Sequence, residues 1–438
     1  MKKYSYIVMM VVVSLLLIST IACGAQSKIE LTFYQWYYTE AKYGPVIDGY
    51  IGAFEEKFPN VKVNPVAITN RDYWDRLTMD IMSGVEGDVV GVDQASMAAY
   101  YYLRPEGAFI SLDKYIEGTS FAEDLVLLDD MEEDGHCIAL PYNWFTFGHI
   151  FYRKSHFEEA GLSVDGMGTW ESFKEGAAKL TVDLDGDGRI DRYGMTLPST
   201  AEAISRWWHQ LWLWTAGGGF FKNEAPPYTA ENVIFDCPAN LFALEYLVDL
   251  KREAFAPGVR DPFQIQELFY NSSLSMFLGA SWSLVMVETN MPTQIYEEDV
   301  DIMPMPSAYY QGELRPPVLV AWSTPLAISS RSKYPDTAWD FIEFLNSEEI
   351  QRDWITRVAS PVNKKVLESS WYKTSFPKIG AFMNLSREFE WRMTPNIAQW
   401  NEIDKVIQEA VKSAYVEVKS PKEALDWGQA EIVKIMRK

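Results

Sequence analysis

Residues 29–92, IELTFYQWYYTEAKYGPVIDGYIGAFEEKFPNVKVNPVAITNRDYWDRLTMDIMSGVEGDVVGV, decide the predicted fold. Residues 29–34 and 61–66 have the composition of strands, and residues 88–92 form a short apolar run typical of a strand buried in a parallel sheet. Between these strands, residues 46–58 and 73–83 carry apolar side chains at helical spacing. The resulting β-α-β-α-β order predicts an open α/β sheet.

The rest of the chain continues this mixture of strands and helices. About 415 residues follow Cys23, which is too many for a single hydrophobic core. The sequence has no internal repeat and no flexible tether, so we expect two lobes between which the chain crosses more than once. Further strands are predicted at 150–153, 300–303 and 318–328, and further helices at 170–180, 240–253, 335–345, 347–357 and 401–416.

The first residues predict an export signal. Lys2 and Lys3 precede an apolar run at 7–18, which is too short to cross a bilayer comfortably, and Ala22 stands before Cys23. A cysteine in this place is where a bacterial lipoprotein is cleaved and acylated, so we expect a signal peptide at 1–22, lipidation of Cys23 and a short tether at 23–27. Thr20 departs from the usual leucine of that motif, and ordinary signal cleavage is the alternative.

Charge and cysteine content narrow the classes of partner. The net charge is −22, and it becomes −24 when Lys2 and Lys3 leave with the signal. Such an acidic chain is not expected to bind nucleic acid, and a polyanionic ligand is disfavoured. Beyond Cys23 the chain has only Cys137 and Cys237, whose spacing fits no metal or redox motif. They form either a disulfide or two buried thiols.

A series of short phrases along the chain resembles one family. These phrases are Phe54-Glu-Glu-Lys-Phe-Pro-Asn-Val-Lys-Val, Ser83-Gly84 before Asp88-Val-Val, Leu140-Pro-Tyr-Asn, Phe151-Tyr-Arg-Lys, Phe157-Glu-Glu-Ala-Gly-Leu, Thr169-Trp170, Ala327-Ile-Ser-Ser-Arg-Ser-Lys-Tyr-Pro, Ala338-Trp-Asp-Phe-Ile-Glu-Phe-Leu and Ser360-Pro-Val. The ordered set resembles the extracellular solute-binding proteins of carbohydrate-uptake ABC systems, the maltose-binding-protein-like group. It covers nearly the whole chain after the signal.

The resemblance implies a periplasmic-binding-protein-like fold with two α/β lobes, three hinge crossings and a ligand cleft between the lobes. The first lobe would comprise 28–141 and 304–359, and the second 142–299 and 361–438, with hinges at 300–303 and 360. It also implies a monomer without catalytic activity or required cofactor. Such a protein closes its lobes on a sugar or short oligosaccharide and delivers the ligand to an ABC permease at the outer face of the membrane or in the periplasm.

Twelve residues fall where the family's cleft loops should lie. Aromatic rings stack on the C–H faces of sugars, and planar polar side chains pair with sugar hydroxyls, so tryptophans with a few acids and amides suit such a ligand. For an average tryptophan, packing in a core is the more common role. The residues that the resemblance assigns to the ligand are Trp36, Tyr37, Glu40, Asp93, Gln94, Asn143, Trp144, Trp207, Trp208, Trp282, Trp322 and Trp400.

Residues 183–191 match the first nine positions of an EF-hand loop. Alternating carboxylates could converge on a structural calcium ion, and Gly188 permits the sharp turn. Gly194 stands at the twelfth position, where that loop has a bidentate glutamate, and an Asx-rich turn without an ion is the alternative. The positions concerned are Asp183, Asp185, Asp187, Arg189 and Asp191.

An enzyme is the competing class. The chain has four histidines, none at metal-binding spacing, and no nucleophile-elbow, zinc-protease or phosphate-loop motif. A glycosidase needs only two carboxylates, so sequence alone does not exclude it. A binding protein for a polyol or glycerol phosphate ester, and a solute receptor that serves a chemosensor, are two further hypotheses that the sequence leaves open.

Overall fold

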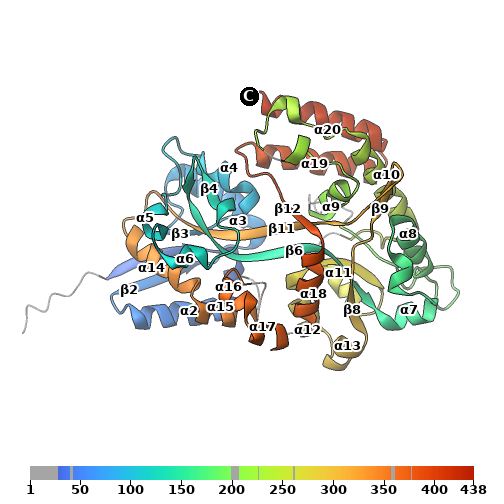
Figure 1. Cartoon of the computed structure of the whole chain (residues 1–438), viewed down its shortest axis with the longest axis horizontal. Coiled ribbons are helices and arrows are strands. Elements are labelled where there is room, and N and C mark those ends of the chain that lie inside the picture. Colours follow the sequence, from blue (N-terminus) through green and yellow to red (C-terminus); the bar gives the residue numbers. More distant parts are fainter. Residues whose placement is uncertain are drawn as a thin grey trace, which may run out of the picture.

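The computed structural model describes residues 28–438 except 40–42, 199–206, 225, 260–261, 357–360 and 376. Its centre is one mixed sheet of eight strands in the order β2-β1-β3-β11-β6-β7, with β12 beside β11 and β8 beside β6 (Figure 1). The strands of this sheet are β1 (Ile29–Tyr34), β2 (Val61–Val66), β3 (Val89–Gly91), β6 (Ala139–Arg153), β7 (Met276–Ala280), β8 (Val300–Pro304), β11 (Val318–Ile328) and β12 (Glu390–Met393).

The first three strands form the predicted α/β unit. β1 pairs in parallel with β2 and with β3, and helices α2 (Tyr43–Lys57) and α3 (Asn70–Ser83) connect them. Gly84 ends α3 in the left-handed conformation with φ 75°, where its backbone N–H donates to the carbonyls of Asp80 and Ile81. The predicted β-α-β-α-β order is therefore confirmed.

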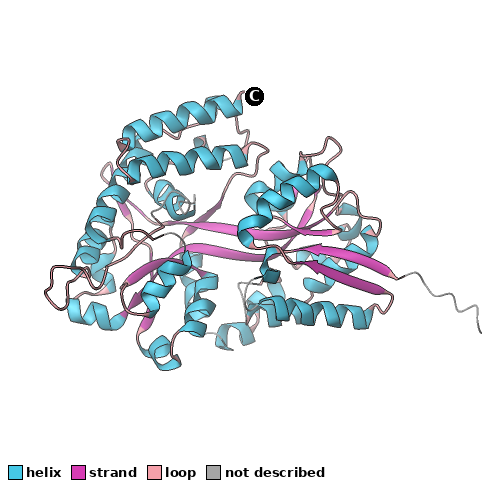
Figure 2. Ribbon diagram, turned by 180° about the vertical axis from the view of Figure 1, so that it is seen from behind, coloured by secondary structure: helices cyan, strands magenta, loops and turns pink. Residues whose placement is uncertain are grey.

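Two long strands join the halves of the molecule. β6 and β11 pair antiparallel from Ala139↔Ala327 to Phe147↔Val320, with an irregularity between Ser323 and Pro325. At one end β11 pairs with β3, and at the other it pairs with β12. Figure 2 shows these strands running through the middle of the molecule with helices on both sides. The two predicted lobes are thus built on one continuous sheet.

Two separate clusters of buried side chains form the cores. The first core packs β1, β3 and the start of β6 against α2, α14 (Pro335–Leu345) and α15 (Glu348–Ile355), with Phe33, Phe54 and Phe341 at its centre. The second core packs β7, β8 and the end of β6 against the C-terminal helices, and includes Trp212 and Tyr415. This division into two cores is what the two-lobe fold requires.

The first crossing lies on β6. Phe145 packs in the first core and Phe147 in the second, so the chain leaves the first core between these residues and not at 141–142 as expected. The difference is small because β6 is continuous: the strand carries the chain through both cores without a turn that could mark the boundary in the sequence.

The second crossing corrects a larger part of the expected division. Met305, Ala308 and Val318 pack in the second core, whereas Leu326 packs in the first. The chain therefore crosses inside β11, and not at 300–303. The physical reason is that β8 pairs with the second-core end of β6, which keeps the chain in that half until β11 begins. Residue 360, the third expected hinge, lies outside the described residues.

The helices agree with most of the predicted positions. The predictions did not include α7, α9, α11, α12, α13, α17, α18 or α20. The longer helices beyond α2 and α3 are α7 (Lys154–Ala160), α8 (Trp170–Lys179), α9 (Trp207–Thr215), α10 (Pro238–Ala254), α11 (Pro262–Tyr270), α12 (Ser281–Asn290), α13 (Thr293–Glu298), α14 (Pro335–Leu345), α15 (Glu348–Ile355), α17 (Ser370–Ser375), α18 (Pro377–Glu388), α19 (Trp400–Tyr415) and α20 (Pro421–Met436). Shorter elements are α4 (Met97–Tyr101), α5 (Asp113–Ile116), α6 (Ser120–Glu123), α16 (Lys364–Glu368), and the strand pairs β4 (Glu132–Glu133) with β5 (His136–Cys137) and β9 (Ala308–Tyr310) with β10 (Glu313–Arg315).

The structure describes both remaining cysteines and the length of each helix. Cys137 and Cys237 are both free thiols, so the disulfide alternative is wrong. Within the described ranges, no helix is both long enough and apolar enough to span a bilayer.

Candidate functional site

Two of the candidate tryptophans lie where the cores meet. Trp144, on β6, and Trp282, in the first turn of α12, are half-buried, and each packs against both the first and the second core. The Trp144 indole N–H donates to the carbonyl of Pro361, at 3.0 Å. These two indoles therefore belong to the junction between the lobes and not to the interior of either one.

A third tryptophan is held in a fixed orientation. The indole N–H of Trp322, on β11, donates to Asp93 Oδ1 at 2.6 Å, and its ring stacks on Phe145 with centroids 5.0 Å apart. Asp93 follows β3 and also accepts the backbone N–H of Ala95 at 3.1 Å, so it caps the short 3-10 turn η2 (Gln94–Ser96). One carboxylate thus links the end of β3 to the crossing strand.

Trp144 and Trp322 do not share one face of the crossing strands. Trp322 pairs with Phe145 in the register of β11 and β6, and Ser323 pairs with Trp144. Directly paired residues project to the same face, and successive residues project to opposite faces. Trp322 and Trp144 therefore lie on opposite faces of this pair of strands, with one indole on each face.

A chain of buried polar side chains connects β1 with the crossing strands. The Tyr37 hydroxyl lies 3.4 Å from Thr324 Oγ1, and the Thr324 hydroxyl donates to Asn143 Oδ1. The Tyr37 backbone N–H donates to Gln35 Oε1, at 3.4 Å. Within the described part of the chain, the amide nitrogens of Gln35 and Asn143 and the side-chain oxygen of Gln94 have no hydrogen-bond partner. Buried amides left in this state are candidates for pairing with a polar ligand or water.

Gln35 and Thr324 were not among the sequence candidates. Gln35 directly precedes the predicted Trp36, at the carboxyl end of β1, where ligands of open α/β sheets are expected. Its position at the end of this strand was therefore the sequence feature that could have identified Gln35 as a site residue. Thr324 carries no comparable signal, because its place beside Asn143 depends on the register between β6 and β11.

The structure corrects two of the candidates. Trp36 is 1% exposed in the first core against Trp74 and Tyr73, and Trp400 is 0% exposed in the second core against Phe220. Their indoles therefore serve packing, because each is enclosed by aromatic side chains of a single core. Glu40 and the side chains of Trp207 and Trp208 lie outside the described residues.

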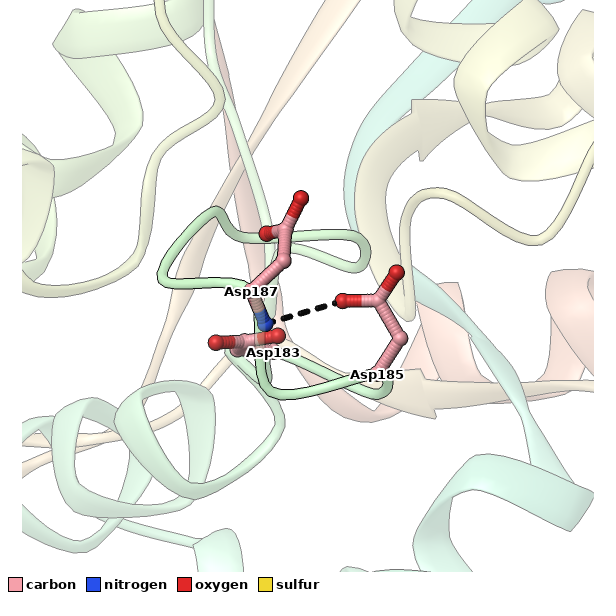
Figure 3. A group of neighbouring side chains, drawn as sticks. All are labelled: Asp183, Asp185 and Asp187. Atoms are coloured by element: carbon pink, nitrogen blue, oxygen red, sulfur yellow. Dashed lines mark hydrogen bonds between the residues drawn. The ribbon is translucent and has the colours of Figure 1, made fainter.

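The acidic loop follows α8 in the chain and lies on the surface. One oxygen from each of Asp183, Asp185 and Asp187 lies within 4.8 Å of the others (Figure 3). These carboxylates also accept backbone N–H groups of their own loop: Asp183 accepts those of Gly186 and Gly188, at 2.7 and 2.8 Å. The bond from Gly188 is the main cause that lowers the pKa of Asp183 below its usual value.

The loop fits a calcium ion only in part. Three converging carboxylates are suitable oxygen ligands, but Asp191 Oδ2 accepts the backbone N–H of Leu184, at 2.7 Å, and Gly194 supplies no twelfth ligand. Calcium therefore stays a prediction, with a structural role, and Arg189 contributes its backbone N–H to Asp187.

We expect weak calcium binding at this loop, with a dissociation constant of about 10⁻⁴–10⁻³ M, because the carboxylate set is exposed and incomplete. Isothermal titration of EDTA-treated protein with CaCl₂ measures it. Asp183→Asn should remove the binding heat, whereas Asp165→Asn, at an exposed position outside the loop, should retain it. Equal heats for the wild type and Asp183→Asn would contradict the calcium site and favour the Asx-rich turn.

Two α/β cores that share crossing strands, with indoles at their junction, define a two-lobed binding protein. The sequence profile of the bacterial extracellular solute-binding proteins matches residues 39–352, which is more than half of the chain. The chain belongs to this family.

Known proteins of similar sequence or structure agree with this assignment. The sn-glycerol-3-phosphate-binding periplasmic protein of Salmonella paratyphi A is 22% identical, over 93% of each chain. A solute-binding protein of Thermotoga lettingae bound to alpha-D-tagatose superposes with a TM-score of 0.79 at 20% identity, over 93% of this chain and 100% of that one. Lmo0181 of Listeria monocytogenes, in complex with cycloalternan, has a TM-score of 0.74 at 20% identity, over 94% and 99% of the two chains. At this identity the structural likeness shows the fold alone.

Proposed function

We propose that this protein is the receptor of an ABC importer for a neutral sugar or short oligosaccharide. The observation that carries the proposal is the placement of Trp144 and Trp282 at the junction of the two cores. Indoles stack on sugar rings, and the nearby amides of Gln35 and Asn143 could pair with hydroxyls. The saccharides bound by the Thermotoga and Listeria proteins support the same class of ligand.

The charge of the junction favours a neutral ligand over a phosphate ester. The residues placed there contribute one carboxylate, Asp93, together with amides and indoles, and none of them is a cation. A phosphate group is usually bound by arginine or lysine. The net charge of −22 also favours a neutral ligand over an anionic one. Because a relative binds sn-glycerol 3-phosphate, this ester is the second ligand to test.

The proposal includes export and anchoring. The extracellular family supports a location outside the cytoplasm, and the predicted signal at 1–22 would place Cys23 at the new N-terminus. Labelling with a fatty acid that Cys23→Ser abolishes would test the lipid anchor. We further propose that the protein is a monomer that binds no nucleic acid and that it docks on the transmembrane subunits of the permease. We also propose that it does not alter its ligand. Release of reducing sugar from oligosaccharides would contradict this last proposal.

Thermal-shift screening of the chain without its signal tests the ligand class. A ligand that binds only the folded state stabilises it by about 2.7 kcal/mol at about 100 times its dissociation constant, so the melting temperature should rise by several degrees. We expect this rise with at least one neutral mono- or oligosaccharide. A rise with glycerol 3-phosphate or an amino acid, and none across the saccharides, would overturn the sugar assignment.

A further inference from the structure

The two lobes also touch at a place separate from the crossing strands. The segment Thr394–Asn401 leads from β12 into α19, whose apolar face packs in the second core. It meets η2 and α4, which follow β3 of the first core, and Ala95 of η2 packs among second-core residues. In Figure 1, α4 and α19 are next to each other, above β6 and β11.

Hydrogen bonds join the lobes at this contact. The Ser96 hydroxyl donates to Asn401 Oδ1, at 2.7 Å, and the backbone N–H of Ala98 donates to Asn396 Oδ1, at 2.8 Å. The Asn396 amide also donates to Glu133 Oε2, at 3.4 Å. We call Ser96, Ala98, Asn396 and Asn401 the lobe latch.

In the latch, asparagines of the second lobe accept hydrogen bonds from the Ser96 hydroxyl and the Ala98 backbone N–H at the start of α4. The first turn of a helix has N–H groups without partners inside the helix, and a side chain at its N-cap usually accepts one of them. Ser96 is the N-cap of α4 but makes no such bond, because its hydroxyl is directed to Asn401. Asn396 instead supplies the acceptor for Ala98. Separation of the lobes would leave both groups to water, so the latch favours the state in which the lobes are in contact.

We propose that Asn396 and Asn401 set the affinity of the binding site without contacting the ligand, by stabilising the closed arrangement of the lobes. This inference rests on the proposed function only in that a ligand binds between the lobes. When ligand binds one of two states, the apparent dissociation constant equals the intrinsic one divided by the population of that state. A bond between the lobes therefore raises affinity by raising the closed population.

The experiment compares Asn396→Ala/Asn401→Ala with the wild type. We expect about tenfold weaker binding of the saccharide found by thermal shift, equivalent to about 1.4 kcal/mol, with most of the change in the dissociation rate. Small-angle scattering of the ligand-free double variant should give a larger radius of gyration. Asn271→Ala is the matched control, since Asn271 also accepts a backbone N–H, that of Ser273, but within one lobe.

A second experiment removes the hydrogen bond between Ser96 and Asn401 by replacing either of its two partners. Ser96→Ala and Asn401→Ala should have equal effects that do not add in the double variant, as expected for two partners of one bond. If Asn401→Ala folds poorly, Ser96→Ala still tests the same bond from the first lobe.

Three outcomes would overturn the latch. They are unchanged affinity in Asn396→Ala/Asn401→Ala, additive effects of Ser96→Ala and Asn401→Ala, or weaker binding with an unchanged ligand-free radius of gyration. The last would mean that the asparagines act otherwise than by holding the ligand-free lobes together. If the wild type binds only a phosphate ester, the sugar proposal fails and the latch is measured with that ester. If no ligand is found, an unchanged radius of gyration alone rejects the latch.

Discussion

Replacing Trp282 with alanine is expected to weaken saccharide binding about a hundredfold, which is ~2.7 kcal/mol. Trp282 is half-buried in the first turn of α12 and packs against both cores, so its ring can contact a ligand at the junction as well as both lobes. Tryptophans that bury a large area at the centre of an interface commonly contribute about 2 kcal/mol or more. Isothermal titration with the saccharide found by thermal shift measures the change.

Trp427→Ala is the matched control for this prediction. Trp427 is also half-buried, but it lies on α20 and packs against the second core alone. We expect its removal to lower the melting temperature and to leave the dissociation constant within about twofold. Trp282→Phe, which keeps an aromatic face, should recover part of the lost affinity. Wild-type affinity in folded Trp282→Ala would place the ligand elsewhere and remove the main support for the aromatic junction.

Lowering the pH from 7 to 5 is expected to decrease the free energy of unfolding by about 4 kcal/mol through two buried histidines. His149 is 0% exposed on β6, stacks on Phe382, and both its ring nitrogens have no hydrogen-bond partner among the described residues. Burial lowers the pKa of His149 to about 3, and burial with the nearby Arg192 and Arg153 lowers that of His156 to about 4.

The sign follows from the order of proton uptake. In the unfolded chain both imidazoles take up a proton near pH 6.5, whereas in the folded protein they stay neutral until the pH approaches their lowered pKa values. Stability is therefore greatest above pH 6.5 and is lost as the pH falls toward 4 and 3. Between pH 7 and pH 5 each histidine contributes a loss of about 2 kcal/mol, because the slope approaches ~1.36 kcal/mol per unit only below pH 6.5.

Chemical denaturation at pH 7 and pH 5 measures this loss. His149→Asn and His156→Asn should each decrease the difference between the two pH values by about half. Burial raises the pKa of Glu224, which acts in the opposite direction, so the comparison of variants is more informative than the wild-type slope. An undiminished pH dependence in both His149→Asn and His156→Asn would contradict the assignment.

The sequence predicted about half of the longer helices and parts of the sheet, because hydrophobic spacing and boundary residues are local properties. β11 and α14 begin and end where predicted, at Val318–Ile328 and Pro335–Leu345, and Pro335 marks the start of its helix. The β-α-β-α-β order and the ordered family phrases also gave the two-lobe fold, which the family profile and the two cores confirm.

The candidate site was harder to predict. Trp36 and Trp282 both follow a strand and both were candidates, but the first is enclosed in one core and the second lies between two. Nothing in their local sequences distinguishes a tryptophan enclosed in one core from a tryptophan between two cores, since burial depends on which surfaces pack around the ring. The same holds for Thr324, whose contact with Asn143 depends on strand register.

By itself the sequence determined the class of fold, the order of the elements and the family, because these depend on hydrophobic spacing and on short phrases read along the chain. Only the tertiary structure decided where the chain crosses between the cores, which indoles lie at the junction, and that Ser96 meets Asn401 from 305 positions away. Contacts between such distant residues arise when the two lobes pack together, and no local pattern specifies that packing.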